Sequence, residues 1–203
     1  MHGSPPSLVL YLHGFRSSPL SAKASRLASW LRGFRPEVTW WCPQLPPSPK
    51  LAMALVERRL QGHDAAALAV VGSSLGGFYA THVAQRTGCR SVVLNPAVDP
   101  ARDLAAYVGE LATFHDPEVR FRFEASFLDE LRELDTGAPL RHPDRCLAVI
   151  AKGDELLDWT EMAARYEGCH RLLIEGSDHG LSDFDLYLDT IVNFLGLRSK
   201  GAN

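Results

Sequence analysis

A Gly-x-Ser-x-Gly pattern at residues 72–76 constrains this chain more than any other feature of its sequence. The apolar run from Leu68 to Val71 precedes the pattern, and an alanine-rich segment with helical periodicity follows at once. In the order strand, tight turn, helix, the serine sits on a strained turn and its hydroxyl points out of the sheet. The glycines select Ser74 over Ser73, because small residues are needed two positions before and after the serine, where neighbouring backbone packs closely. The pattern therefore predicts a nucleophile at Ser74, and it does not predict a phosphate loop because no Gly-Lys-Ser/Thr follows.

The composition is that of a soluble globular chain and excludes several function classes. Of the 203 residues, 46% are hydrophobic and 22% are charged, with a formal net charge of −3, so no electrostatic feature points to nucleic acid. No apolar run reaches the length of about eighteen residues that a membrane span needs, and no leader pattern opens the chain. The four cysteines have no C-x-x-C spacing and favour free thiols in a reducing compartment over disulfides or a metal site. We therefore expect a cytoplasmic protein with no membrane, nucleic-acid or metal partner.

Strand-like and helix-like segments alternate along almost the whole chain. This alternation predicts right-handed strand–helix–strand units and an α/β fold, with a mainly parallel sheet of about six strands covered by helices on both faces. The expected strands are residues 8–12, 38–41, 68–71, 91–94, 147–151 and 172–174.

The stretch between Leu94 and Cys146 interrupts this rhythm, because it contains no convincing strand. Asp99 and Pro100 open a predicted helix that extends to Leu111, and a second predicted helix ends at Gly137. In the first helix Leu104, Tyr107, Val108 and Leu111 are in phase. An excursion of this size from an α/β sheet is usually a lid over the active-site end. We expect one domain over residues 1–203 with a helical lid at 99–140. Lid aromatics are expected either to line an acyl pocket or to pack the lid onto the body: Tyr107, Phe114, Phe121, Phe123 and Phe127.

A serine hydroxyl is a poor nucleophile unless a histidine takes its proton and a carboxylate orients that histidine. In hydrolases with this serine motif the three residues follow the chain order Ser, acid, His, and the last two lie in loops after later strands. Asp154 follows the strand 147–151 and His179 follows the strand 172–174. The chain order is therefore the one expected for such hydrolases, and both residues are predicted to lie at the sheet edge where Ser74 lies. The remaining histidines lie on helix surfaces or in polar connections, apart from His13, which is treated below with the oxyanion loop.

Other carboxylates compete with Asp154 as the acid. Asp158 is the main alternative, although Asp158-Trp-Thr-Glu161 has the form of a capping box that opens the next helix. Glu155 points away if Asp154 points in, and Asp178 is too close in sequence to turn onto His179. A similar capping box at Ser182 and Asp185 is expected to open the last helix.

An oxyanion hole needs two N–H groups aimed at the charge that develops on the substrate oxygen. The backbone N–H of Leu75, directly after the nucleophile, is the first candidate. The second is the backbone N–H of Phe15 in the His13-Gly14-Phe15 turn after the first strand, where Gly14 permits close approach. His13 is expected to hold this loop in place and not to transfer protons.

These residues resemble the YqiA-like esterases of the α/β-hydrolase superfamily over nearly the whole chain. The matching segments are residues 10–15, 17–19, 21–25, 43–47, 71–77, 95–98, 153–155, 157–158, 174–176 with 179, and 194–197. The resemblance implies an α/β-hydrolase fold without the first two antiparallel strands of larger members, and Ser74, Asp154 and His179 as the triad. It also implies hydrolysis of acyl esters, including acyl-CoA thioesters. The region 101–140, which would decide the substrate, matches least.

The chemistry expected from these residues is two-step hydrolysis of a small-molecule acyl ester through an acyl-enzyme, with no metal or organic cofactor. Two alternatives remain open. The same triad serves thioesterases, amidases and lyases, because fold and triad do not determine the substrate. A non-catalytic binding protein with a hydrolase shape is the other alternative, although a binding protein has no need of all three triad residues.

Overall fold

The computed structural model describes residues 5–198, and its centre is a sheet of six parallel strands. Residues 1–4 and 199–203 of the expected single domain lie outside the described residues. The strands run in the spatial order β2-β1-β3-β4-β7-β8. Their bounds are β1 Leu8–Leu12, β2 Thr39–Trp41, β3 Leu68–Ser73, β4 Arg90–Leu94, β7 Cys146–Ala151 and β8 His170–Ile174. All six strands expected from the sequence are present, with ends shifted by one or two residues.

The register of the central strands brings their carboxyl ends together. Leu12 at the end of β1 pairs with Gly72 of β3, and Ser73 at the end of β3 pairs with Leu94 of β4. The loops that follow these strands therefore begin at one edge of the sheet, which is where ligands bind in α/β folds. Every residue of β1, β3 and β7 is buried, as expected for parallel strands covered on both faces.

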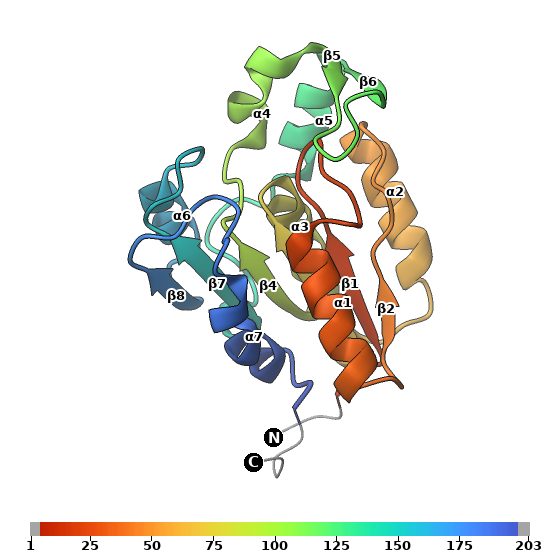
Figure 1. Ribbon diagram of the computed structural model, residues 1–203, viewed down its shortest axis with the longest axis vertical. Coiled ribbons are helices and arrows are strands. Elements are labelled where there is room, and N and C mark those ends of the chain that lie inside the picture. The colour runs from red at the N-terminus through yellow and green to blue at the C-terminus, as the bar shows by residue number, and fades with distance from the viewer. Residues whose placement is uncertain (1–4, 199–203) are drawn as a thin grey trace.

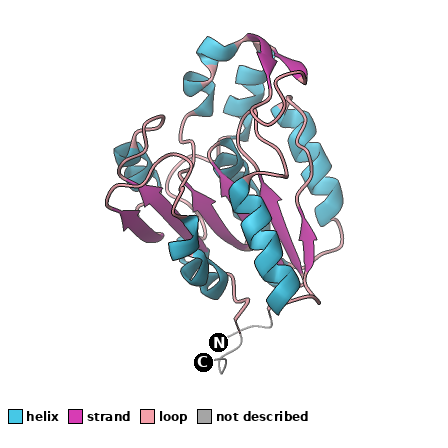
Figure 2. Cartoon of the chain, viewed as in Figure 1, coloured by secondary structure: helices cyan, strands magenta, loops and turns pink. Residues whose placement is uncertain are grey.

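Helices cover both faces of the sheet (Figures 1 and 2). On one face α1 and α7 bury apolar side chains in a core that also contains Val9, Val71 and Val149. On the other face α2, α3 and α6 pack on a core that contains Leu10, Val70 and Ile150. The bounds of these helices are α1 Ala22–Phe34, α2 Pro49–Leu60, α3 Leu75–Thr87, α6 Trp159–Arg165 and α7 Leu188–Phe194, with 3-10 turns at Ala65–Ala67, Pro143–Arg145 and Phe184–Leu186.

The insertion between β4 and β7 is mixed and not purely helical, which corrects the expectation for residues 99–140. It contains α4 (Pro100–Asp103), a 3-10 turn (Ala105–Tyr107), the antiparallel strands β5 (Gly109–Ala112) and β6 (Arg120–Phe123), and α5 (Ser126–Leu134). It lies at the end of the molecule drawn uppermost in Figure 1.

The expected continuous helix over residues 100–111 is wrong because the chain turns into a hairpin. Asp99 does cap α4, accepting a hydrogen bond from the backbone N–H of Arg102 at 3.1 Å. Gly109 then adopts φ +138°, a conformation that side chains disfavour and that ends helical geometry. Arg120-Phe-Arg-Phe123 alternates polar and apolar side chains with the period of a strand, and this signal identifies the hairpin that helical periodicity missed.

The expected capping box at Ser182 and Asp185 is also wrong. The last helix begins at Leu188 after a 3-10 turn, and Asp185 forms an ion pair with Arg26 of α1.

Among residues 5–198, no helix has the length and apolar content that crossing a membrane requires.

Candidate active site

Ser74 lies on a strained turn between β3 and α3. Its backbone has φ 56° and ψ −122°, a conformation that a residue with a side chain rarely adopts. A Cβ atom on Gly72 would lie 2.0 Å from the carbonyl oxygen of Gly76, and a Cβ on Gly76 would lie 1.9 Å from that of Leu12. The two glycines are therefore required by backbone contact, which is the reason the motif gave for selecting Ser74.

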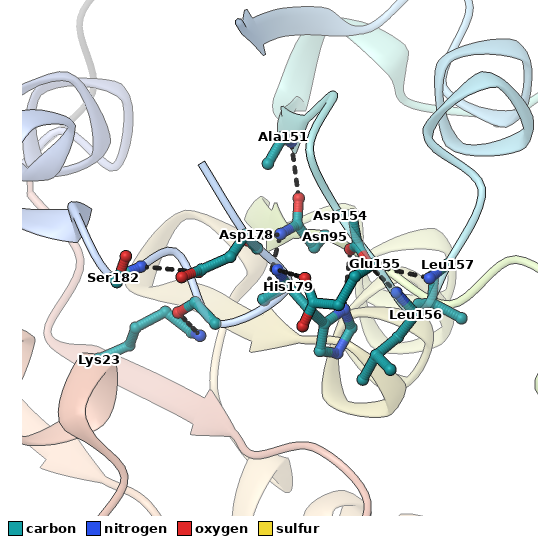
Figure 3. Close-up of polar contacts among 11 residues, drawn as sticks. Lys23, Asn95, Ala151, Asp154, Glu155, Leu156, Leu157, Asp178, His179 and Ser182 are labelled. Carbon is teal, nitrogen blue, oxygen red and sulfur yellow. Dashed lines mark hydrogen bonds and ion pairs between the residues drawn. The ribbon is translucent and has the colours of Figure 1, made fainter. Parts of the chain in front are cut away.

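His179 and Asp154 meet after β8 and β7. The imidazole Nδ1 of His179 lies 2.8 Å from Oδ2 of Asp154, and the aspartate side chain is completely buried (Figure 3). The other carboxylate oxygen, Oδ1, accepts hydrogen bonds from the backbone N–H groups of Leu156 and Leu157 at 2.9 and 2.8 Å. Because an ionised carboxylate only accepts, Nδ1 donates and Nε2 is left as the acceptor. This is the tautomer that a general base needs.

The competing carboxylates have other contacts. Asp158 accepts hydrogen bonds from the N–H and hydroxyl of Thr160 at 2.8 and 2.7 Å and caps α6. Glu155 accepts a hydrogen bond from the backbone N–H of His179 at 2.9 Å, so it holds the backbone and not the ring. Asp178 accepts from the N–H of Ser182. The carboxylate that contacts the imidazole of His179 is that of Asp154.

Ser74 and His179 line one small cavity of about 170 Å³. Within residues 5–198 the two side chains are not hydrogen-bonded to each other, and such catalytic hydrogen bonds often tighten only when substrate is bound. A substrate bound in this cavity would therefore be in contact with both Ser74 and His179.

Asn95 joins the loops that carry the acid and the histidine, a role that sequence reasoning did not assign. Its side chain is fully buried, and Nδ2 donates to the carbonyl oxygens of Asp178 and His179 at 2.9 and 3.1 Å. Its Oδ1 accepts from the backbone N–H of Ala151, the last residue of β7, at 2.8 Å. Lys23 of α1 adds a hydrogen bond from Nζ to the carbonyl of Gly180 (Figure 3). Asn95 and Lys23 therefore both hold the histidine loop, residues 178–180, in place through its backbone carbonyl groups.

Replacing Asn95 with alanine should lower both stability and turnover. The substitution removes three buried hydrogen bonds and leaves backbone groups unpaired, which we expect to cost about 2–4 kcal/mol in the free energy of unfolding. Displacement of the histidine loop should reduce kcat by about 10- to 100-fold. Thermal unfolding and steady-state kinetics measure the two effects, with Asn193→Ala on the exposed face of α7 as the matched control. A folded Asn95→Ala variant with unchanged kcat would contradict this role.

The expected oxyanion donors lie beside the nucleophile. A Cβ atom on Gly14 would be 3.3 Å from the Cβ of Ser74, so the loop after β1 lies directly against the serine. The backbone N–H groups of Phe15 and Leu75 donate no hydrogen bond to any other residue in the described part of the chain, and both residues line a larger cavity of about 450 Å³. Both N–H groups are thus free to bind a substrate oxygen.

His13 ties the oxyanion loop to the proline-rich segment after β2. Its Nε2 accepts a hydrogen bond from the backbone N–H of Leu45 at 3.1 Å, and Nδ1 donates to the carbonyl of Gly14 at 3.0 Å. Burial lowers the pKa of His13, so the ring stays neutral and keeps both hydrogen bonds. These contacts fit a positioning role for His13.

The hairpin formed by β5 and β6 contacts the loop after β1, which carries Phe15 and Arg16. Arg16 donates from Nε to the carbonyl of Ala112 at 2.7 Å, and its own carbonyl accepts from the N–H of Phe114 at 2.9 Å. The ring of Phe15 makes edge-to-face contacts with Phe121 and Phe123. Phe121 lines the larger cavity and Phe114 the smaller one, whereas Phe123 is buried in the core, so the lid aromatics divide between pocket and packing.

The larger cavity is the better candidate for an acyl group. Apolar side chains, including Leu45, Pro46, Tyr79 and Val119, line much of it. The polar residues in its lining are His13, Arg16, Ser17, Gln44, Thr113 and His115. No group of three or more residues able to hold a metal ion occurs among residues 5–198.

Comparison with known proteins gives the family and the fold. Residues 8–196 match the family described as "Uncharacterised protein family (UPF0227)". The UPF0227 protein of Yersinia enterocolitica serotype O:8 is 27% identical over 192 residues, covering 92% of this chain and 98% of that protein. A UPF0227 protein of Yersinia pseudotuberculosis serotype O:1b is 26% identical over the same shares.

Among solved structures, mouse alpha/beta hydrolase domain-containing protein 10 superposes with a TM-score of 0.72 at 16% identity, covering 96% of this chain and 91% of that one. The esterase domain of a Rhodothermus marinus protein gives a TM-score of 0.67 at 20% identity, covering 95% and 88% of the two chains. The chain therefore belongs to the UPF0227 family, the YqiA-like group that its motifs resemble, and has the α/β-hydrolase fold.

Proposed function

We propose that the protein is a serine esterase that hydrolyses small-molecule acyl esters through an acyl-enzyme on Ser74. The observation that carries this proposal is the buried Asp154–His179 hydrogen bond of 2.8 Å at the rim of the cavity that also exposes Ser74. A nucleophile, a base and an acid that orients the base are the three parts that acyl transfer needs. Esterases and lipases occur among the proteins of similar fold, including a monoacylglycerol lipase of Paleococcus ferrophilus (TM-score 0.67, 16% identity).

In the first step Nε2 of His179 takes the proton of Ser74 as the serine oxygen attacks the ester carbonyl carbon. Asp154 stabilises the imidazolium that forms. The N–H groups of Phe15 and Leu75 bind the developing oxyanion, each contributing about 3–4 kcal/mol to the transition state. The C–O bond to the alcohol then breaks, and the alcohol oxygen takes the proton from His179.

In the second step water attacks the acyl-enzyme. His179 takes a proton of the water as the water oxygen bonds to the carbonyl carbon. The bond between that carbon and Oγ of Ser74 then breaks, Oγ takes the proton from His179, and the carboxylic acid leaves. No residue outside those already named has to transfer a proton. The insertion lines part of the proposed acyl cavity through Thr113, Val119 and Phe121.

A series of p-nitrophenyl esters from acetate to palmitate tests this proposal. We expect kcat/KM to rise by about three- to fourfold per methylene while the chain fills the apolar cavity, and to fall again for the longest chains. Val119→Trp at the exposed rim of this cavity should shift the optimum to shorter acyl chains. Turnover is followed by release of p-nitrophenolate.

Acyl-CoA thioesters and anilides with the same acyl chains, measured beside this ester series, distinguish the alternatives. Hydrolysis of acyl-CoA or anilide substrates with no hydrolysis of any oxygen ester would favour a thioesterase or an amidase on the same triad. An absence of turnover with every substrate would contradict the proposed function.

A further inference from the structure

Two of the four cysteines lie next to each other at the amino ends of β7 and β8, the last two strands of the sheet (Figure 1). Leu147 of β7 is the register partner of His170 of β8. Cys146 and Cys169 each come one residue before these partners, so the same parallel register places the two cysteines opposite each other. Both contact the core on the face of the sheet that α2, α3 and α6 cover, so their side chains point to the same side.

This arrangement permits a disulfide without a change of strand register. Neighbouring strands of a sheet lie about 4.8 Å apart. Two cysteines can be joined when their Cα atoms are about 4.4–6.8 Å apart and their Cβ atoms face the same way. By their register and their common face, Cys146 and Cys169 meet both conditions, and both are free thiols in this structure.

The two thiols differ in exposure and in ionisation. Cys169 is partly exposed, whereas Cys146 is only 2% exposed. A hydrogen bond from the thiol of Cys146 lowers the pKa of Cys169. The charges of Arg171 and Arg165 act in the same direction. The same hydrogen bond, together with burial, raises the pKa of Cys146. Cys169 is therefore the thiol that ionises first and that a reagent meets first, with the protonated thiol of Cys146 beside it.

The other two cysteines have thiols that resist ionisation. Cys42 is also partly exposed, but burial of its thiol raises its pKa to about 12. Cys89 is buried, and burial raises its pKa as well. Because the thiolate and not the thiol is the nucleophile, the four cysteines are expected to differ in reactivity, with Cys169 the most reactive.

We propose that Cys169 and Cys146 form a peroxide-reactive thiol pair, in which a hydroperoxide oxidises Cys169 and Cys146 converts the product to a reversible disulfide. In the first step the thiolate sulfur of Cys169 attacks the outer oxygen of the hydroperoxide. The O–O bond breaks, and the alkoxide leaves and takes a proton from water as the alcohol. Cys169 is then a sulfenic acid.

In the second step the sulfur of Cys146 attacks the sulfenic sulfur of Cys169. The S–S bond forms, and the hydroxide leaves with the proton of the thiol as water. The two thiols together lose two electrons, which the O–O bond of the hydroperoxide has taken up. Oxidation of Cys169 also removes the negative charge that holds the pKa of Cys146 high, so the second thiol ionises more readily once the first has reacted. A dithiol reductant returns both residues to thiols.

Thiol counting in the reduced, full-length protein tests the proposal. The protein is treated with tert-butyl hydroperoxide, denatured and alkylated, and its peptides are identified by mass spectrometry. We expect four alkylated cysteines before treatment and two after it, with one disulfide that links the peptides of Cys146 and Cys169. At early times Cys169 should lose its thiol at least about tenfold faster than Cys42 in the same sample. Ester hydrolysis is not part of this readout, so failure of the esterase proposal leaves the test intact.

Three serine variants separate the roles of the two thiols. In Cys146→Ser the sulfenic acid of Cys169 has no neighbouring thiol, so it should pass to the sulfinic acid, a gain of about 32 Da that a dithiol reductant does not reverse. Cys169→Ser should keep Cys146 reduced at the same dose of hydroperoxide. Cys42→Ser is the matched control, because Cys42 is also partly exposed but is not part of the pair, and it should form the disulfide at the wild-type rate.

Thermal unfolding checks that each variant is folded, and peptide mapping of the wild-type protein keeps the test available if Cys146→Ser does not fold. Equal rates of thiol loss at Cys169 and Cys42 overturn the proposal. A wild-type protein that keeps all four thiols, or one that links a different pair of cysteines, overturns it as well.

Discussion

Replacing Ser74 with alanine should reduce ester hydrolysis by about 10⁵- to 10⁶-fold while leaving the fold intact. In the proposed mechanism the serine oxygen forms the acyl-enzyme, so no other group in the site can take its place. The strained backbone at φ 56° does not depend on the hydroxyl, because neighbouring backbone enforces the turn at Gly72 and Gly76. The measurement is kcat for the optimal p-nitrophenyl ester, with thermal unfolding on the same samples.

Ser29→Ala is the matched control for this prediction, because Ser29 lies on α1 and its hydroxyl contacts only Arg32. The control should keep the wild-type rate. A Ser74→Ala variant that is folded and still hydrolyses the ester at more than about a thousandth of the wild-type rate would remove Ser74 from the mechanism.

Replacing Asp154 with asparagine should lower kcat by about 10⁴-fold. The carboxylate is fully buried and accepts three hydrogen bonds, from the ring of His179 and from the N–H groups of Leu156 and Leu157. An amide has one oxygen and one NH₂ group, so it cannot accept all three with the same geometry. If its NH₂ group faces the imidazole, Nδ1 becomes the acceptor and Nε2 carries the proton, which leaves His179 unable to take a proton from Ser74.

Asp158→Asn tests the competing acid in the same experiment. Asparagine is as good an N-cap residue as aspartate, so α6 should be retained and the rate should stay near that of the wild type. Comparable large losses in both variants, or a large loss in Asp158→Asn alone, would contradict the assignment of the acid to Asp154.

The parts of the fold that follow from local pattern were predictable. Each of the six strands is a short apolar run, and the order of strands and helices leaves few ways to build a parallel sheet. The serine turn was predictable because glycine at positions 72 and 76 is a requirement of backbone contact. The positions of Ser74, Asp154 and His179, each directly after an apolar strand, were enough to predict that they lie at one sheet edge.

The insertion was harder to predict because its structure depends on contacts distant in sequence. The segment 104–111 has apolar residues at helical spacing, yet residues 109–112 pair with Arg120–Phe123, and the carbonyl of Ala112 accepts a hydrogen bond from Arg16 in the loop after β1. The expected capping box at Ser182 failed for a related reason. Asp185 is paired with Arg26, 159 residues away in the sequence, and helical spacing carries no information about such a partner.

Asn95 marks the limit of sequence reasoning about the site. Asn95 is fully buried, and its hydrogen bonds to the chain segments that carry the candidate acid and histidine form only because β4 and β7 are neighbours.

The most direct test of the central claim is intact-protein mass spectrometry after treatment with a fluorophosphonate, a reagent that phosphonylates activated serines. Ser74 acting with His179 predicts one adduct per chain in the wild-type protein, located on the peptide that contains Ser74, and none in Ser74→Ala. An unlabelled wild-type protein, or equal labelling of the wild type and Ser74→Ala, would contradict the claim that this site is a serine hydrolase.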